Sequence, residues 1–192
     1  MTRMLLALLL LLAGVPMVHA GGVLDQRMTA SDKDRLARFD AIMTEALAEA
    51  RAGGSAADVK LLDDALSGAA LPLAGGFDPT GDWKCRTFKA GGGLPLVAYG
   101  WFKCRISDDG SGWMLQKLTG SQRTSGLFYT LSDTRLAYLG AGHYADEKAR
   151  RYGEDAKHDQ VAVAERRGEN RIVLMFPAPQ FESKLDVLVL ER

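Results

Sequence analysis

The sequence predicts an α+β protein in which an N-terminal pair of helices precedes an eight-stranded antiparallel meander, closed as a barrel or strongly curled. Three observations support this fold class. Apolar residues change from helical spacing to alternation at Gly81. Eight short alternating segments then follow one another, separated by turn residues. The last of these segments are apolar on both faces, so the helices are expected to cover their outer face.

The first twenty residues match a cleaved secretory signal. Arg3 precedes an apolar run over residues 4–18, and small residues lead to Ala20. Gly21 rather than a cysteine follows the expected cut, which argues against a lipid anchor. We therefore expect a periplasmic or secreted protein that does not span the membrane. The expected organisation is a signal peptide over 1–20, a helical segment over 21–80 and a barrel-like domain over 81–192.

The charge of the mature chain is close to balanced. Arg3 is the only lysine or arginine in the signal, so cleavage leaves 23 basic against 24 acidic side chains. Such a balance gives no support to bulk nucleic-acid binding. We expect no nucleic-acid partner.

Two helices are expected before the sheet. Ser31 can cap the first, which continues with apolar residues at helical spacing until Gly53. Ser55 opens a shorter one that stops near Gly68, and a connector rich in proline and glycine follows.

The strands are predicted from alternation and from the turn residues between them. The predicted ranges are 83–89, 97–106, 113–119, 126–131, 135–139, 161–166, 171–176 and 185–190.

Cys85 and Cys104 are the two cysteines of the chain. Because an exported chain meets an oxidising compartment, we expect them to form a disulfide between adjacent strands, directly opposite one another. The alternatives are a catalytic thiol or two ligands of a zinc site. Both alternatives need a nearby histidine or a second cysteine pair.

One face of this predicted hairpin combines cations with aromatic rings. If the cysteines point to the core, alternation places their neighbours on the outer face. Cations beside ring faces suit anionic head groups, acidic glycans or single-stranded nucleic acid. The alternative is a solvated strand face, partly covered by the acidic helical segment. The binding candidates on this face are Lys84, Arg86, Phe88, Trp101, Lys103 and Arg105.

Residues 140–160 form a long polar segment that contains both histidines of the mature chain. Long loops on barrels often carry function. A short helix over 144–152 would bring a histidine and a glutamate close to i, i+4 positions, and the second histidine with its neighbouring aspartate could complete a metal site. The spacing matches no recognised ligand pattern, so no metal is expected, and a mobile or surface-capping loop is the alternative. The metal candidates are His143, Glu147, His158 and Asp159.

Residues 121–125 are polar and lie between two predicted strands. Their hydroxyls and the guanidinium of Arg123 could bind an anion, and a plain hairpin connection explains them as well. The sequence contains no nucleophile elbow, phosphate loop or histidine-containing triad, so we predict no catalytic residue and no cofactor. A pair of catalytic carboxylates that only folding brings together would leave no motif in the sequence.

Gly81-Asp82-Trp83 resembles the Gly-x-Trp motif of lipocalins and other calycins. In those proteins the tryptophan packs at the closed barrel end against an arginine near the last strand. The resemblance implies a lipocalin-like barrel in which Arg192 takes that position, although the N-terminal helical pair departs from the usual lipocalin plan.

Four longer motifs extend along the predicted barrel: GDWKCR at 81–86, YGWFKCR at 99–105, KLTGSQRTSG at 117–126 and FESKLDV at 181–187. Together they are similar to a proteobacterial family of exported proteins, domain of unknown function 4893. This resemblance implies a bacterial, periplasmic protein. It brings no activity, ligand or catalytic residue.

The sequence favours a non-catalytic binding protein that is a monomer or homodimer. Its expected partner is a small amphipathic ligand or an anionic component of the cell envelope. One alternative is a periplasmic hydrolase with its site in the 140–160 segment, using carboxylates or the two histidines. Another is a structural or adaptor protein whose apolar C-terminal strands form a subunit interface.

Overall fold

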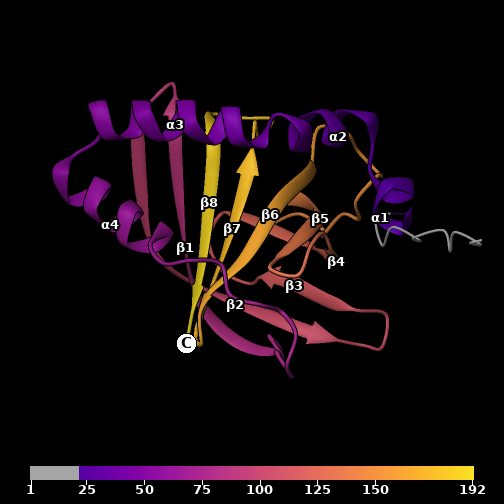
Figure 1. Cartoon of the computed structure of the whole chain (residues 1–192). Coiled ribbons are helices and arrows are strands. Elements are labelled where there is room, and N and C mark those ends of the chain that lie inside the picture. Colours follow the sequence, from indigo (N-terminus) through magenta and orange to yellow (C-terminus); the bar gives the residue numbers. More distant parts are fainter. Residues whose placement is uncertain (1–21) are drawn as a thin grey trace, which may run out of the picture.

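A computed structural model describes residues 22–192, so the predicted signal peptide lies outside the described residues. Four helices precede eight antiparallel strands, which pair in sequence order and close between β8 and β1 into a barrel (Figure 1). The predicted fold class is confirmed. No helix within residues 22–192 is long and apolar enough to cross a membrane. The strands are β1 (Gly81–Gly92), β2 (Leu96–Asp108), β3 (Trp113–Lys117), β4 (Gln122–Thr130), β5 (Arg135–Tyr144), β6 (Asp159–Gly168), β7 (Arg171–Pro177) and β8 (Ser183–Glu191).

All eight predicted strands are present; seven are longer than alternation indicated, among them β4 and β5, and β3 is two residues shorter. β4 begins at Gln122 and β5 continues to Tyr144, because these two residues pair with one another. The prediction of a loop over residues 121–125 is therefore wrong for all but the first residue. Thr124 faces inward in this extension. Its hydroxyl forms a hydrogen bond with the buried Tyr138 hydroxyl at 2.6 Å, so the polar side chain is satisfied inside the barrel.

The helices are α1 (Gly22–Arg27), α2 (Ala30–Ala37), α3 (Phe39–Gly53) and α4 (Ala56–Leu66). The first predicted helix is wrong in two details. It is divided at Arg38, and its cap is Thr29, whose hydroxyl accepts a hydrogen bond from the Asp32 N–H at 3.2 Å. The predicted cap Ser55 is confirmed, since its hydroxyl accepts from the Asp58 N–H at 3.1 Å.

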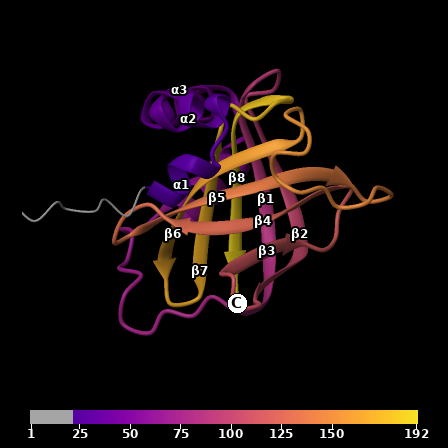
Figure 2. The same cartoon turned by 90° about the vertical axis from the view of Figure 1, so that its right-hand side faces the viewer.

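The barrel wall separates two apolar layers. Outside it, α3 contacts β1, β8, β2 and β7, and the helices gather on one side of the barrel (Figure 2). Leu47 and Ala50 of α3 pack with Val187 and Val189, which are almost fully buried. The prediction that helices cover the apolar C-terminal strands is confirmed. These strand faces are therefore not free to form the subunit interface that the adaptor hypothesis needs.

The end of the barrel that holds the C-terminus is sealed, and we call it the sealed end. Trp83 is buried there, and its indole N–H donates to the Pro79 carbonyl at 2.9 Å. The Arg192 guanidinium lies 3.9 Å from the centroid of the Trp83 ring and donates to the same carbonyl at 2.7 Å. The position implied for Arg192 by the calycin resemblance is the one that the structure shows.

The Cys85–Cys104 disulfide is confirmed. The expectation that the two cysteines face each other directly is wrong, because Cys85 pairs with Phe102 and Trp83 pairs with Cys104. The bond therefore joins diagonal neighbours, whose Cα atoms are 5.9 Å apart. Twist between the strands brings one diagonal close enough for a disulfide.

Two glycines leave room for a buried tyrosine inside the barrel. Gly126 and Gly140 pair between β4 and β5, and a Cβ on Gly126 would lie 2.3 Å from the Gly140 Cα. A Cβ on Gly140 would lie 2.2 Å from the Tyr138 hydroxyl. The missing side chains thus leave room for Tyr138 inside the barrel, where its hydroxyl reaches Thr124.

Candidate functional site

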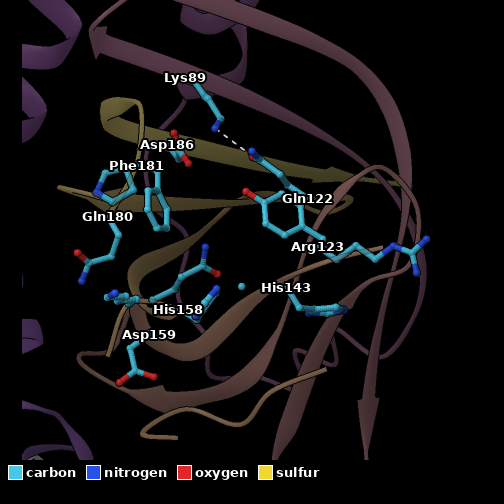
Figure 3. Close-up of a pocket in the computed structure, with 14 residues that line it drawn as sticks. Lys89, Gln122, Arg123, His143, His158, Asp159, Gln180, Phe181 and Asp186 are labelled. Carbon is cyan, nitrogen blue, oxygen red and sulfur yellow. Dashed lines mark hydrogen bonds between the residues drawn. The ribbon is translucent and has the colours of Figure 1, made fainter. Parts of the chain in front are cut away.

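The end of the barrel opposite the sealed end opens into a cavity of about 120 Å³. A deeper extension of about 60 Å³ continues into the barrel, with Gln122, Gln160 and Asp186 lining both parts. Figure 3 shows the residues that line the upper part, and we call the two parts together the mouth cavity. Below it the barrel interior is filled by an apolar cluster that includes the disulfide and Tyr138. A molecule bound inside the barrel would therefore be restricted to the mouth.

Lys89 of β1 lies in the wall of the mouth cavity and is only 8% exposed. Its ammonium donates to Gln122 Oε1 at 3.0 Å and forms an ion pair with Glu182. Burial lowers the pKa of Lys89, but the bond to Glu182 and nearby carboxylates outweigh it, so the pKa is raised overall. Lys89 is thus a cation whose charge is neutralised within the protein.

Lys117 of β3 lies deeper and is 9% exposed. Its ammonium donates to the Gln122 carbonyl at 2.9 Å and lies 4.2 Å from the centroid of the Phe102 ring. Within residues 22–192 it forms no ion pair. Burial lowers the pKa of Lys117 to about 8. This side chain is a buried cation without a direct counterion.

Asp186 of β8 lines both parts of the mouth cavity. Its carboxylate accepts a hydrogen bond from the Ser183 hydroxyl and forms no ion pair among the described residues. Burial raises the pKa of Asp186 to about 6. Lys117 and Asp186 therefore carry opposite charges on one cavity without contacting each other.

Both histidines of the mature chain also line the mouth cavity. His143 lies on β5 rather than in a loop, and its Nδ1 is buried without a hydrogen-bond partner. Burial and the nearby Arg123 lower the pKa of His143. His158 contacts Asp155 through Nδ1 at 2.8 Å. The predicted loop is thus wrong for His143, which lies on a strand, whereas His158 lies in a turn before β6.

The expected helix over 144–152 is wrong, because this stretch consists of a strand end, turns and irregular chain. Glu147 bonds Arg150 at 2.8 Å and the Tyr144 N–H at 3.0 Å, while Asp159 accepts from the Gly153 N–H at 2.8 Å. In the part of the chain that the structure describes, no three histidine, cysteine or acidic side chains gather so that they could hold a metal ion.

Two loops meet above the mouth cavity. Gln180, between β7 and β8, donates from Nε2 to the Ala156 carbonyl at 3.1 Å. Ala178 and Glu182 border this loop with positive φ angles of 45° and 72°, which side-chain-bearing residues rarely adopt. Phe181 lines the cavity and is 58% exposed. Strained backbone of this kind is often found beside ligand sites.

The predicted basic-aromatic face lies elsewhere, on the outside of β1 and β2. Lys84 and Arg86 lie 4.5 Å and 4.4 Å from the centroid of the Trp101 ring, which is 42% exposed. Lys84 also pairs with Glu191 at 3.2 Å. Lys103 is opposite Lys84 and exposed.

Three other candidates are less available on the outer surface. Phe88 is buried in the cluster beneath α3. Arg105 pairs with Asp82 at 2.6 Å. Arg123 donates from Nε to the Gly120 carbonyl at 3.1 Å and extends away from Lys89 and Asp186 (Figure 3).

Two acidic side chains of the helical segment form ion pairs with β8 and not with the cations of this face. These are Glu45 and Glu49 of α3, which pair with Lys184. Trp101 and Lys103 therefore remain exposed.

A family model described as Domain of unknown function (DUF4893) matches residues 25–190. The chain belongs to the DUF4893 family. The match extends over α2 to α4 and all eight strands, so the family includes both the helices and the barrel. No curated protein and no solved structure matches this DUF4893 chain.

The charged groups of the DUF4893 mouth were missed by sequence analysis. A signal for them exists: Lys89 lies two residues after Thr87, and Asp186 two residues before Leu188, so each charge is in phase with residues that face into the barrel. Charges at inward-facing positions predict a polar site, once the inward face is known.

Proposed function

We propose that this protein binds a small polar or amphipathic molecule in the mouth cavity. The observation that carries the proposal is the charged wall of this cavity. Lys89, Lys117 and Asp186 are held at the mouth of a barrel whose interior below them is filled by an apolar cluster. Buried charges of this kind reduce stability relative to well-packed apolar residues, and a bound polar group offsets that loss.

The size of the cavity limits the ligand. A volume of about 120 Å³ corresponds to roughly eight to twelve water-sized spaces, well below the ~300 Å³ from which drug-sized ligand sites begin. The ligand we propose therefore has on the order of ten non-hydrogen atoms. Phe181 at the rim offers an apolar contact for the part that faces solvent.

Binding has better support than hydrolysis. The residues that line the upper cavity include two histidines but no serine or cysteine that could act as a nucleophile beside them. A hydrolase at this site would have to activate water directly. A purified sample that releases product from a panel of ester, amide and phosphate substrates would favour that alternative.

Retention of ligands tests the proposal. Purified protein is incubated with a polar metabolite extract and recovered by ultrafiltration, and the retained compounds are identified by mass spectrometry. We expect retention by the native protein and by the exposed control variant Lys60→Met. Loss is expected in Lys117→Met and Asp186→Asn. Equal retention by all four proteins would place binding outside the mouth cavity.

We also propose that the mature protein is exported and begins at Gly21. The charged and apolar pattern of the first twenty residues and the Cys85–Cys104 disulfide support this proposal, because disulfides persist in oxidising compartments. N-terminal sequencing of the protein from a periplasmic fraction tests it. A start at Met1 in the cytosolic fraction would contradict it.

A second candidate function is binding of an anionic envelope component on the outer basic-aromatic face. Lys84 and Arg86 flank the exposed Trp101 ring, and Lys103 has no ion-pair partner among the described residues. Replacing Lys84, Arg86, Lys103 and Arg105 together by serine is expected to abolish retention on heparin resin and on anionic liposomes. Unchanged retention would refute this second function.

A further inference from the structure

Two charged side chains deep in the mouth cavity, Lys117 and Asp186, are opposite in sign and form no ion pair among the described residues. Lys89 is neutralised by Glu182. Lys117 donates to a backbone carbonyl and, at 3.4 Å, to the Thr87 hydroxyl, and lies against a ring face, while Asp186 accepts from a single hydroxyl. Both side chains line the same deep extension, and they form no ion pair with each other. The cavity thus presents a buried ammonium and a half-buried carboxylate that do not pair with each other.

We propose that the ligand is a small zwitterion, a molecule that carries an ammonium and a carboxylate, as a free amino acid does. This inference rests on the proposed function and names its ligand class. The ligand carboxylate would pair with Lys117 and the ligand ammonium with Asp186. Each protein charge would then gain the counterion that it lacks among the described residues.

A ligand with a single charge fits this arrangement less well. An anion would satisfy Lys117 but add a second negative charge near Asp186, and a cation would do the reverse. Arg123 also lines the cavity, but its guanidinium bonds the Gly120 carbonyl and extends away from Lys89 and Asp186 (Figure 3). A zwitterion leaves the charge of the cavity unchanged.

Neutral groups around the two charges are suited to the remaining polar atoms of such a ligand. Gln122 and Gln160 line both parts of the cavity. The Oε1 atom of Gln160 accepts from the Thr124 hydroxyl at 2.6 Å, which leaves its amide nitrogen to donate. The deep extension that Lys117 and Asp186 line has a volume of about 60 Å³, and the upper part adds about 120 Å³, which together admit a molecule of roughly ten non-hydrogen atoms, a size that includes the smaller amino acids.

The test uses calorimetry and thermal unfolding with matched probes on the mature protein at pH 7. The probes are the smaller and the acidic free amino acids, the carboxylic acids that lack their amino group, and the amines that lack their carboxylate. We expect at least one amino acid to bind and to raise the unfolding temperature. Its two single-charge relatives are expected to bind at least about thirtyfold more weakly.

Variants assign the two ends of the ligand. Lys117→Met and Asp186→Asn are each expected to weaken amino-acid binding by at least about thirtyfold, while the exposed controls Lys60→Met and Asp133→Asn leave it unchanged. Equal binding of the carboxylic acid or of the amine would overturn the zwitterion class and leave the proposed function standing. Failure of every probe, with no compound retained from a metabolite extract, would overturn both.

Discussion

Replacing Asp186 by asparagine is predicted to stabilise the protein at neutral and alkaline pH while abolishing ligand binding. The substitution keeps the size of the side chain and removes its charge. In the native protein this carboxylate lies in the barrel wall with one hydrogen bond, from Ser183. Lys89 and Lys117 attract it through space, and Glu182 repels it.

The magnitude follows from the pKa. Burial raises the pKa of Asp186 from 3.8 to about 6. Ionisation in the folded state is therefore less favourable than in the unfolded chain, by about 3 kcal/mol at 1.36 kcal/mol for each pKa unit. The unfolding free energy that the protein has with Asp186 protonated is fully present below pH 3.8, and about 3 kcal/mol of it is lost as the pH rises through 6. Allowing about 1 kcal/mol for a weaker hydrogen bond, we expect the variant to gain about 2 kcal/mol above pH 7.

The assay is urea unfolding of the native protein and of Asp186→Asn at several values between pH 4 and pH 8. Because other carboxylates titrate in the same range, the informative quantity is the difference in unfolding free energy between the two proteins at each pH. This difference is expected to be small or negative at pH 4 and to reach about 2 kcal/mol at pH 8. Asp133→Asn, an exposed aspartate at the sealed end, serves as the matched control and should show no such trend.

A difference that does not vary with pH would refute the burial of an ionised Asp186. A variant that is less stable at pH 8 would show that the carboxylate supports the fold rather than weakening it. In either case the charged mouth would not lower the stability of the fold in favour of binding.

Three further changes follow from the same structure. Lys117→Met is expected to stabilise the protein at pH 7 by up to about 3 kcal/mol, because burial lowers the pKa of this lysine from 10.5 to about 8. The unfolding free energy of the native protein should rise between pH 8 and pH 10.5, and that of the variant should not. Replacing Cys85 and Cys104 by alanine should lower the unfolding free energy by about 3 kcal/mol. Urea unfolding measures this change, with reduced native protein as the control. An unchanged urea midpoint would contradict the expected role of the disulfide. Gly140→Ala should destabilise the barrel by more than 3 kcal/mol, because its new methyl group would overlap a buried tyrosine hydroxyl, whereas Gly100→Ala, which has open space around it, should unfold at nearly the native temperature.

The strands could be predicted because each depends on local alternation and on the turn residues that end it. Their lengths could not, because a strand continues as far as its partner allows. β4 reaches back to Gln122 only because Tyr144 of β5 is available to pair with it. The same limit applies to the helices, where the break at Arg38 is not visible in the apolar spacing.

The outer face shows what alternation can and cannot provide. It placed Lys84, Arg86 and Trp101 on one face, and the structure groups them there. It also placed Phe88 on that face, but α3 covers this part of the barrel and buries the ring. Which portion of a strand face is covered depends on helix packing that no local pattern encodes.

The mouth cavity could not be predicted as a site, because its groups come from distant parts of the chain. Lys89, Lys117 and Asp186 belong to β1, β3 and β8, and only closure of the barrel brings them together. The sequence shows that these residues alternate in step with their neighbours. This alternation identifies them as inward-facing only when the interior face is known, which the disulfide-bonded cysteines indicate.

The measurement that tests the central claim most directly is native mass spectrometry of the protein purified gently from its own host, compared with its denatured mass. We expect an additional mass that corresponds to a small polar molecule, present in the native protein and in Asp133→Asn, and absent from Asp186→Asn. The same additional mass in all three proteins, or none in any of them after addition of the host's polar metabolites, would contradict ligand binding at the mouth of the barrel.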